Sequence, residues 1–299
     1  MKTVRTVSEL RAALASERSP GRTLGLVPTM GSFHDGHLSL MRRARAECDA
    51  LVVSLFVNPA QFGPDEDLAA YPRDERRDAA LASSQGVDYL FAPAPNEVYP
   101  PGFDTSVAVG GLTSVLCGDP ARRGPEHFRG VTTVVTKLLN MVQPDVAYFG
   151  QKDAQQALVI RKLVRDLDIP VRIEVCPTVR DGDGLALSSR NRYLTPGERE
   201  RALALRRALA AAEGAVASGE RAGPAVLAAA RSELAAADVE PEYLELRSAS
   251  DLSPVDRVNG STLLAVAARL GRARLIDNTI LPGDEEPGPG TPELNGGGS

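Results

Sequence analysis

The feature that most constrains the fold of this chain is the alternation, along its first half, of short apolar runs with amphipathic segments. The runs have the length of strands and lie at 24–28, 50–57, 87–92 and 146–149, with an alternating, half-exposed run at 171–175. Between them, apolar residues at 38–48 and 131–142 recur every three or four positions, which is typical of helices that pack by one face. This order predicts an α/β fold, a parallel sheet with helices on both faces.

The pattern changes after Pro177. Thr195 begins a helix signal, with Pro in the first turn and Glu three residues after the cap. The sequence predicts helices at 195–217 and 224–237, then strands at 243–247, 262–268 and 274–278. We therefore expect a Rossmann-like domain over residues 1–178, a smaller C-terminal α+β domain over 179–282, and a disordered Gly- and Pro-rich tail over 283–299. Residues 93–130, rich in Pro and Gly, are predicted to be irregular.

Composition excludes several classes of function. The 299 residues include 34 Lys and Arg against 39 Asp and Glu, a formal net charge of −5, so nucleic acid is not an expected partner. No run approaches 18 apolar residues and the N-terminus lacks the apolar core of a secretory signal, so no membrane partner is expected. Three widely spaced cysteines without a CxxC pair are typical of reduced thiols, which favours a cytoplasmic protein and argues against zinc.

His34-Asp35-Gly36-His37 directly follows the first buried strand and opens a helix. A helix N-terminus presents free N–H groups and a partial positive charge, which suits phosphate. Two imidazoles three residues apart can face the same site, and Gly36 lets a phosphate approach the backbone. A bare HxxH is also typical of ordinary surface histidines, but this placement between strand and helix favours a phosphate site.

Three further polar turns are candidates for the same site. They are Gly-Gln-Lys-Asp at 150–153, Leu-Ser-Ser-Arg-Asn at 187–191 and Asn-Pro-Ala-Gln-Phe-Gly at 58–63. Lys152 could reach a nucleotide phosphate, two hydroxyls and a guanidinium could clamp one, and the amides could orient a small polar substrate. Taken singly, each is more often a solvated turn than a binding site. The chain has no GxxxxGK[ST] loop, no GxGxxG after a strand and no GxSxG elbow, which argues against kinase-type, nicotinamide-type and triad-hydrolase sites.

Together these motifs resemble the pantoate–β-alanine ligase (pantothenate synthetase) family. The resemblance covers about residues 1–282 and rests on four segments in the same order, 28–37, 56–62, 149–156 and 188–194. The His34/His37 pair resembles the HxGH signature of class I nucleotidyltransferases, and 188–190 takes the place of their mobile KMSKS loop.

The resemblance implies a two-step ligase of pantothenate and coenzyme A biosynthesis. Pantoate carboxylate attacks the α-phosphate of ATP, giving pantoyl adenylate and diphosphate, and the amine of β-alanine then displaces AMP. The expected partners are ATP, Mg²⁺, pantoate and β-alanine, and the family expectation is a homodimer. Such an enzyme positions its substrates and stabilises charge on phosphate, so it needs no protein nucleophile.

The family pattern also implies roles for individual residues. His37, as the proposed proton donor, and His34, Lys152, Ser188, Ser189 and Arg190 would be catalytic. Gln61 and Gln156 would hold pantoate, with Gln61 also near β-alanine and Asn58 lining the site, while Asp78 would lie near magnesium. Contacts to ATP would come from Met30, Gly31, Ser32, Phe33, His34, Asp35, Gly36, His37, Gly150, Gln151, Lys152, Asp153, Val179, Leu187, Ser188, Ser189 and Arg190.

The chain departs from that pattern in a few places. Gln151 and Leu187 stand where many relatives have Glu and Met, Arg77 precedes Asp78 where an acidic pair is common, and the loop 117–127 is longer than usual. The alternatives are another HxGH nucleotidyltransferase, a nucleotide-binding regulator without turnover, and an RNA-synthetase fragment. The first would need a basic cluster for a substrate phosphate, retention of the polar residues in every motif argues against the second, and the acidic balance argues against the third.

Overall fold

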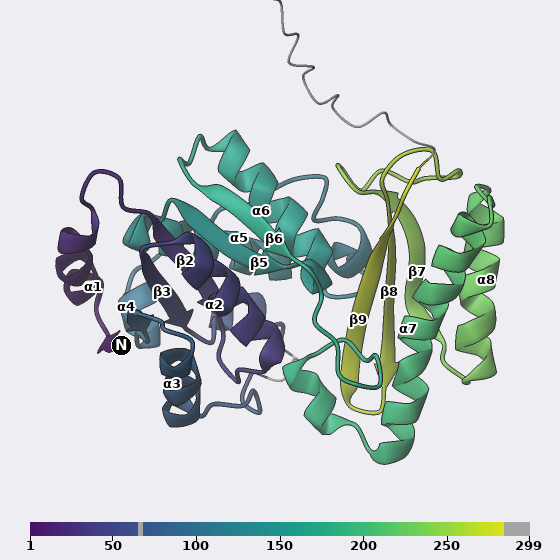
Figure 1. Cartoon of the computed structure of the whole chain (residues 1–299), viewed down its shortest axis with the longest axis horizontal. Helices are drawn as coiled ribbons and strands as arrows, with labels where there is room; N and C mark the ends of the chain where they lie inside the picture. The colour runs from purple at the N-terminus through teal and green to yellow at the C-terminus, as the bar shows by residue number, and fades with distance from the viewer. Residues whose placement is uncertain (65–67, 284–299) are drawn as a thin grey trace, which may run out of the picture.

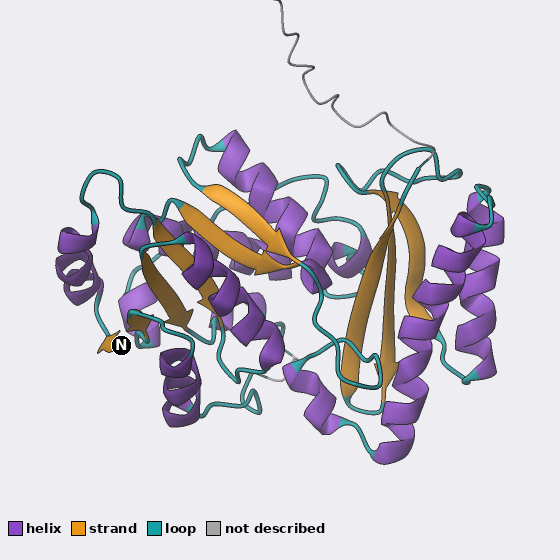
Figure 2. Cartoon of the chain, viewed as in Figure 1, coloured by secondary structure: helices purple, strands orange, loops and turns teal. Residues whose placement is uncertain are grey.

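The computed structural model describes residues 1–64 and 68–283. Its elements fall into two units, a parallel sheet with helices on both faces and a smaller antiparallel sheet backed by two long helices (Figures 1 and 2). The predicted α/β class is confirmed. The tail predicted for 283–299 lies outside the described residues, except for Gly283. No helix within the described ranges is long and apolar enough to cross a membrane.

The larger sheet has six parallel strands in the order β1-β4-β3-β2-β5-β6. They are β1 Lys2–Val4, β2 Leu24–Thr29, β3 Ala50–Leu55, β4 Tyr89–Phe91, β5 Val146–Gly150 and β6 Arg172–Cys176. From β2 the chain builds outward to β3 and β4, and β5 then joins the other side of β2. The order of strands therefore reverses between β2 and β5, which is where open α/β sheets bind their ligands.

Neighbouring residues of the central strands point to opposite faces and enter different cores. In β2, Leu26 packs in the core beneath α1, α5 and α6, whereas Val27 packs beneath α2 and α3. In β5, Phe149 and Tyr148 divide in the same way. Burial on both faces is the reason that these strands are almost continuously apolar. The covering helices are α1 Val7–Leu14, α2 Asp35–Glu47, α3 Glu75–Ser84, α5 Pro125–Val142 and α6 Ala154–Asp166, with one further turn of helix at α4 Pro95–Val98.

The second unit packs one face of its sheet on two helices and the other face on the first unit (Figure 1). It contains α7 Pro196–Ala217, α8 Gly223–Ala236 and the antiparallel strands β7 Pro241–Ser248, β8 Thr262–Leu270 and β9 Ala273–Leu281. In β8, Leu264 contacts the helices and Leu263 joins the core of the parallel-sheet unit. The predicted capping box at Thr195 and Glu198 is present. The boundary at 178/179 falls after β6 and stays a prediction.

The first unit differs from the prediction in two places, one helix boundary and one strand that was not predicted. The helix predicted at 131–142 begins at Pro125, inside the segment predicted to be irregular. Its first turn is polar, so apolar periodicity could not mark it; Pro125 at the first helical position was a signal that the prediction did not use. The strand β1 was not predicted, because three residues are too short for a periodic signal and only pairing with β4 makes them a strand.

Candidate active site

The turns that leave β2 and β5 border a cavity of about 250 Å³ at the point where the strand order reverses. Residues from all four sequence segments meet there. Those predicted site residues that line it are Met30, His34, Gly36, His37, Asn58, Gln61, Gly150, Lys152, Asp153, Gln156, Val179, Leu187, Ser188, Ser189 and Arg190. Gly31, Ser32, Phe33, Asp35, Gln151 and Asp78 lie outside that lining.

A buried carboxylate shapes the turn between β2 and α2. Asp78 of α3 has no exposed surface and accepts hydrogen bonds from the backbone N–H groups of Ser32 at 2.7 Å and Phe33 at 2.8 Å. Gly31 has φ +86°, and a Cβ there would lie 2.6 Å from Leu55 Cδ1, so this close turn requires glycine. Both oxygens of Asp78 are therefore engaged by the backbone. The role near magnesium predicted for Asp78 stays a prediction.

The two histidines that follow lie against one another at the start of α2. Their ring centroids are 4.1 Å apart, and the backbone N–H of His34 donates to His37 Nδ1 at 3.3 Å. Burial and the nearby Lys152 ammonium lower the pKa of His34 to about 4. Burial, His34 and Lys152 hold the pKa of His37 well below its usual value. Both rings are therefore neutral at neutral pH, and His37, whose Nδ1 accepts, carries its proton on Nε2 and can donate from there.

Lys152 is carried by a 3₁₀ turn, Gln151–Asp153, that the second unit holds in place. Asn278 of β9 is buried, and its amide Nδ2 donates to the carbonyl oxygens of Gln151 at 3.0 Å and Lys152 at 2.9 Å. Gln151 returns a hydrogen bond to Asn278 Oδ1 at 3.0 Å. The side chain of Gln151 thus faces β9, while Lys152 and Asp153 line the cavity.

The Ser-Ser-Arg segment reaches the cavity because residues 179–187 before it fold back as a short antiparallel turn, in which Arg180 pairs with Ala186. The backbone N–H of Leu187 donates to the carbonyl of Val179 at 3.0 Å, which places both residues in the lining. Arg180 forms a pair of hydrogen bonds, at 2.6 and 3.0 Å, with the buried carboxylate of Asp277 on β9. Ser188 Oγ accepts from the backbone N–H of Arg190 at 3.3 Å and begins a short 3₁₀ helix.

The amide side of the cavity is built on a close approach of α5 to the turn after β3. A Cβ on Gly130 would lie 2.1 Å from the carbonyl oxygen of Ala60, so α5 can pack here only with glycine. Asn58 is 1% exposed; its Nδ2 donates to Gln61 Oε1 at 3.0 Å and to Gly130 O at 3.1 Å. Its Oδ1 accepts from the Tyr99 hydroxyl at 2.8 Å. Asn58 therefore orients Gln61 rather than standing free in the cavity.

Arg123, His127 and Tyr71 also line the cavity, and sequence reasoning missed all three. His127 Nδ1 lies 2.8 Å from the carbonyl oxygen of Gln61, and Arg123 Nη1 lies 3.1 Å from His127 Nε2. They stand where the loop 117–127 enters α5. One signal was available, since His127 is the third of only three histidines in the chain and follows two arginines.

Comparison with known proteins shows the family of the chain. The sequence model of the family described as pantoate-beta-alanine ligase matches residues 2–280. Pantothenate synthetase of Moorella thermoacetica is 53% identical over 282 residues, which are 94% of this chain and 99% of that protein. Pantothenate synthetase 1 of Bradyrhizobium diazoefficiens is 54% identical over 94% of this chain and 98% of its own length.

Solved structures lead to the same result. Pantothenate synthetase from Thermus thermophilus superposes with a TM-score of 0.88 at 49% identity, covering 93% of this chain and 99% of that one. The pantoate-beta-alanine ligase of Francisella tularensis, described as complexed with beta-gamma ATP and beta-alanine, has a TM-score of 0.77 at 32% identity, with 94% and 97% covered. These matches indicate none of the three alternatives, which were a different HxGH nucleotidyltransferase, a regulator without turnover and an RNA-synthetase fragment. The chain belongs to the pantoate–β-alanine ligase, or pantothenate synthetase, family.

Proposed function

We propose that this enzyme condenses pantoate with β-alanine through a pantoyl-adenylate intermediate, with AMP and diphosphate as the other products. In the first step a carboxylate oxygen of pantoate attacks the α-phosphorus of ATP, and the bond from that phosphorus to the bridging oxygen breaks, so diphosphate leaves with the electron pair. In the second step the amine of β-alanine attacks the activated carbonyl, and AMP leaves with one former carboxylate oxygen.

The observation that carries this proposal is that a neutral histidine pair, Lys152, the 188–190 segment and the amide side chains of Gln61 and Gln156 line one cavity. His37 donates from Nε2 to an α-phosphate oxygen, and Lys152, Ser188 and Arg190 stabilise the charge that develops on the leaving diphosphate. The nucleotide is bordered by His34, by Ser189 and by the backbone of the turns at 30–37, 150–153 and 179–187.

The amide side fits a small hydroxy acid. Gln61 and Gln156 hold the hydroxyl and carboxylate groups of pantoate, and Gln61 also borders β-alanine. Val131, Val134 and Val135 of α5 line the same cavity and give an apolar surface for the dimethyl carbon of pantoate. Tyr99 holds Asn58 as a neutral hydroxyl, because burial raises the pKa of Tyr99 to about 12.

Magnesium fits this site as a companion of ATP rather than as a resident metal. Within residues 1–64 and 68–283 no group of three or more His, Cys, Asp or Glu could hold a metal ion. Asp153 is the carboxylate in the cavity lining, and it lies beside Lys152. Mg²⁺ commonly takes one or two carboxylates together with substrate phosphates, and here it would neutralise charge on those phosphates. We further propose that the enzyme acts as a homodimer in the cytoplasm, where its three buried, unpaired cysteines stay reduced.

The test follows an oxygen atom. Pantoate labelled with ¹⁸O in its carboxylate is incubated with ATP, Mg²⁺, β-alanine and the enzyme, and the products are analysed by mass spectrometry. We expect one labelled oxygen in each AMP and none in diphosphate. ADP with labelled inorganic phosphate would indicate an acyl-phosphate route, and unlabelled AMP would contradict the adenylate.

A further inference from the structure

A second cavity, of about 230 Å³, lies beside the first, between the parallel-sheet unit and the sheet β7-β8-β9. The two cavities share wall residues, among them Lys152, Gln156, Ser188 and Arg190. The two cavities therefore border one another along these residues. The catalytic steps proposed above assign no substrate or product to this second cavity.

The wall contributed by the second unit is cationic. Arg269, Arg272 and Arg274 all line the cavity and fall within six residues, at the hairpin that joins β8 to β9. Arg269 and Arg274 are directly opposed across the two strands. Residues directly opposite one another lie on the same face of a sheet, so Arg269 and Arg274 bring their positive charges to one side of it.

Nearby carboxylates do not neutralise the wall. Glu242 pairs with Arg274 at 2.7 Å and lies 3.7 Å from Arg269, so one carboxylate serves two guanidinium groups. In the described part of the chain Arg272 has no hydrogen bond or ion pair. Asp277, which also lines the cavity, is already engaged by Arg180 at 2.6 Å.

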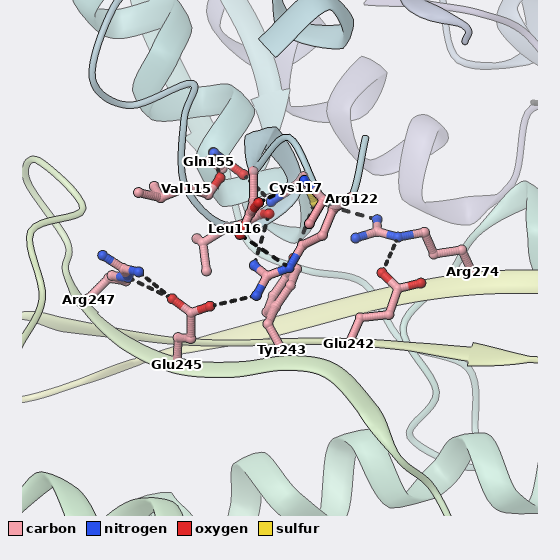
Figure 3. A network of polar contacts seen from close by, with 12 residues as sticks. Val115, Leu116, Cys117, Arg122, Gln155, Glu242, Tyr243, Glu245, Arg247 and Arg274 are labelled. Carbon is pink, nitrogen blue, oxygen red and sulfur yellow. Dashed lines mark hydrogen bonds and ion pairs between the residues drawn. The ribbon is translucent and has the colours of Figure 1, made fainter. Parts of the chain in front are cut away.

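Several contacts hold the Arg274 side chain in place (Figure 3). Its Nε donates to Glu242, Nη1 lies 3.5 Å from Cys117 Sγ, and its guanidinium stands 5.9 Å from the centre of the Tyr243 ring. Its side chain is 15% exposed, and Nη2 is buried without a partner among the described residues. These contacts fix the guanidinium beforehand, so less side-chain entropy is lost when an anion in the cavity approaches it.

On the other side of Tyr243, the loop 117–127 closes the same region. Arg122 donates to the carbonyl of Leu116 at 2.9 Å and to Glu245 of β7 at 3.1 Å, and stacks 4.7 Å from the Tyr243 ring (Figure 3). The loop is therefore anchored to the second unit, and Leu116, Cys117 and Arg123 line the same cavity as the arginines.

We propose that this second cavity binds the inorganic diphosphate that the adenylation step releases. Diphosphate breaks away from the α-phosphorus beside Lys152, Ser188 and Arg190, and those residues border both cavities. Transfer to Arg269, Arg272 and Arg274 separates diphosphate from the acyl adenylate, so attack by the β-alanine amine is favoured over re-formation of ATP. This inference rests on the proposed function, and it adds a product site to it.

The first experiment measures binding without turnover. Isothermal titration of diphosphate is carried out on the enzyme saturated with α,β-methylene-ATP, which fills the nucleotide site. We expect binding to persist, and to weaken about tenfold in Arg272→Gln, the loss typical of one charge-assisted hydrogen bond. Arg269→Gln is the second variant, and Arg231→Gln, an exposed arginine on α8 outside both cavities, is the matched control. Loss of all diphosphate binding in the presence of the analogue, or equal affinity in the three variants and the parent, overturns the proposal.

The second experiment distinguishes diphosphate from another anionic group in the reaction, the carboxylate of β-alanine. Inhibition of AMP formation by added diphosphate is measured together with the KM of β-alanine. We expect Arg272→Gln to raise the inhibition constant about tenfold and leave that KM unchanged. A raised KM for β-alanine with unchanged inhibition would assign the cavity to the amino acid instead. If no AMP is formed by the parent enzyme, the proposed function fails, whereas the titration still decides whether the cavity binds diphosphate.

Discussion

Replacing Asp78 by Asn tests whether the turn before the histidine pair depends on a buried carboxylate. Asp78 is fully buried and accepts two backbone hydrogen bonds, at 2.7 Å from Ser32 and 2.8 Å from Phe33. Asn keeps the shape but offers one acceptor oxygen, and its NH₂ group faces the other N–H. A hydrogen bond to a charged group contributes roughly 1.5–3 kcal/mol, and an unsatisfied buried donor costs roughly 1–3 kcal/mol.

Relief of the buried charge offsets part of this loss, so we expect Asp78→Asn to lower the free energy of unfolding by about 3 kcal/mol. At about 2–4 °C per kcal/mol, the melting temperature should fall by roughly 6–12 °C. The KM for ATP should rise as well, because the turn positions His34 and the start of α2. Differential scanning calorimetry and steady-state kinetics measure the two effects.

Asp74→Asn on the same helix is the matched control. Asp74 is exposed and caps α3 by accepting from the N–H of Arg77 at 3.0 Å, and Asn caps helices about equally well. This variant should melt within about 2 °C of the parent. If Asp78→Asn melts equally close to the parent, the carboxylate does not hold the turn and our reasoning about it is refuted.

Three further predictions concern the cavity. His37→Ala should lower kcat by about 10²–10³ while circular dichroism shows an intact fold, and near-normal turnover would remove His37 from the catalytic residues. Lys152→Ala should chiefly slow AMP formation and Gln156→Ala should chiefly raise the KM for pantoate; equal effects on ATP and pantoate in both variants would contradict this division. The pKa of His34 is lowered to about 4 in the folded protein, whereas an exposed histidine has a pKa of about 6.5. Between these two values the unfolded chain binds a proton that the folded protein does not, so stability falls as the pH drops from 6.5 toward 4. Between pH 7 and pH 5 the free energy of unfolding in urea should fall by on the order of 1–2 kcal/mol more in the parent than in His34→Gln. Equal losses in the two proteins would show that His34 is not the group responsible.

Local pattern was sufficient for most of the fold. The strands β2, β3 and β5 are buried on both faces, so their sequences are almost continuously apolar, and α2 and α6 each follow a strand and a polar turn. The capping residues of α7 lie next to one another in the chain. Interactions of this kind span only a few residues, so they can be predicted from the local sequence.

Positions that depend on distant partners carried no such pattern. Asn278 holds the turn of Lys152 from 126 residues away along the chain, and Asp78 holds the turn at 32–33 from 45 residues away. Nothing near either residue distinguishes it from an ordinary polar residue on a strand or helix. The direction of each side chain was decided only when the sheets and helices packed.

The sequence by itself therefore determined the alternation of strands and helices, the change of class after Pro177, and the polar turns at strand ends that carry the histidines and Lys152. Only the tertiary structure decided that the second unit supplies Asn278 to the turn that carries Lys152, and a group of arginines to the cavity beside it. The physical reason is that periodicity and capping are short-range effects, whereas a cavity between two sheets exists only after both have formed and their facing side chains have packed against one another.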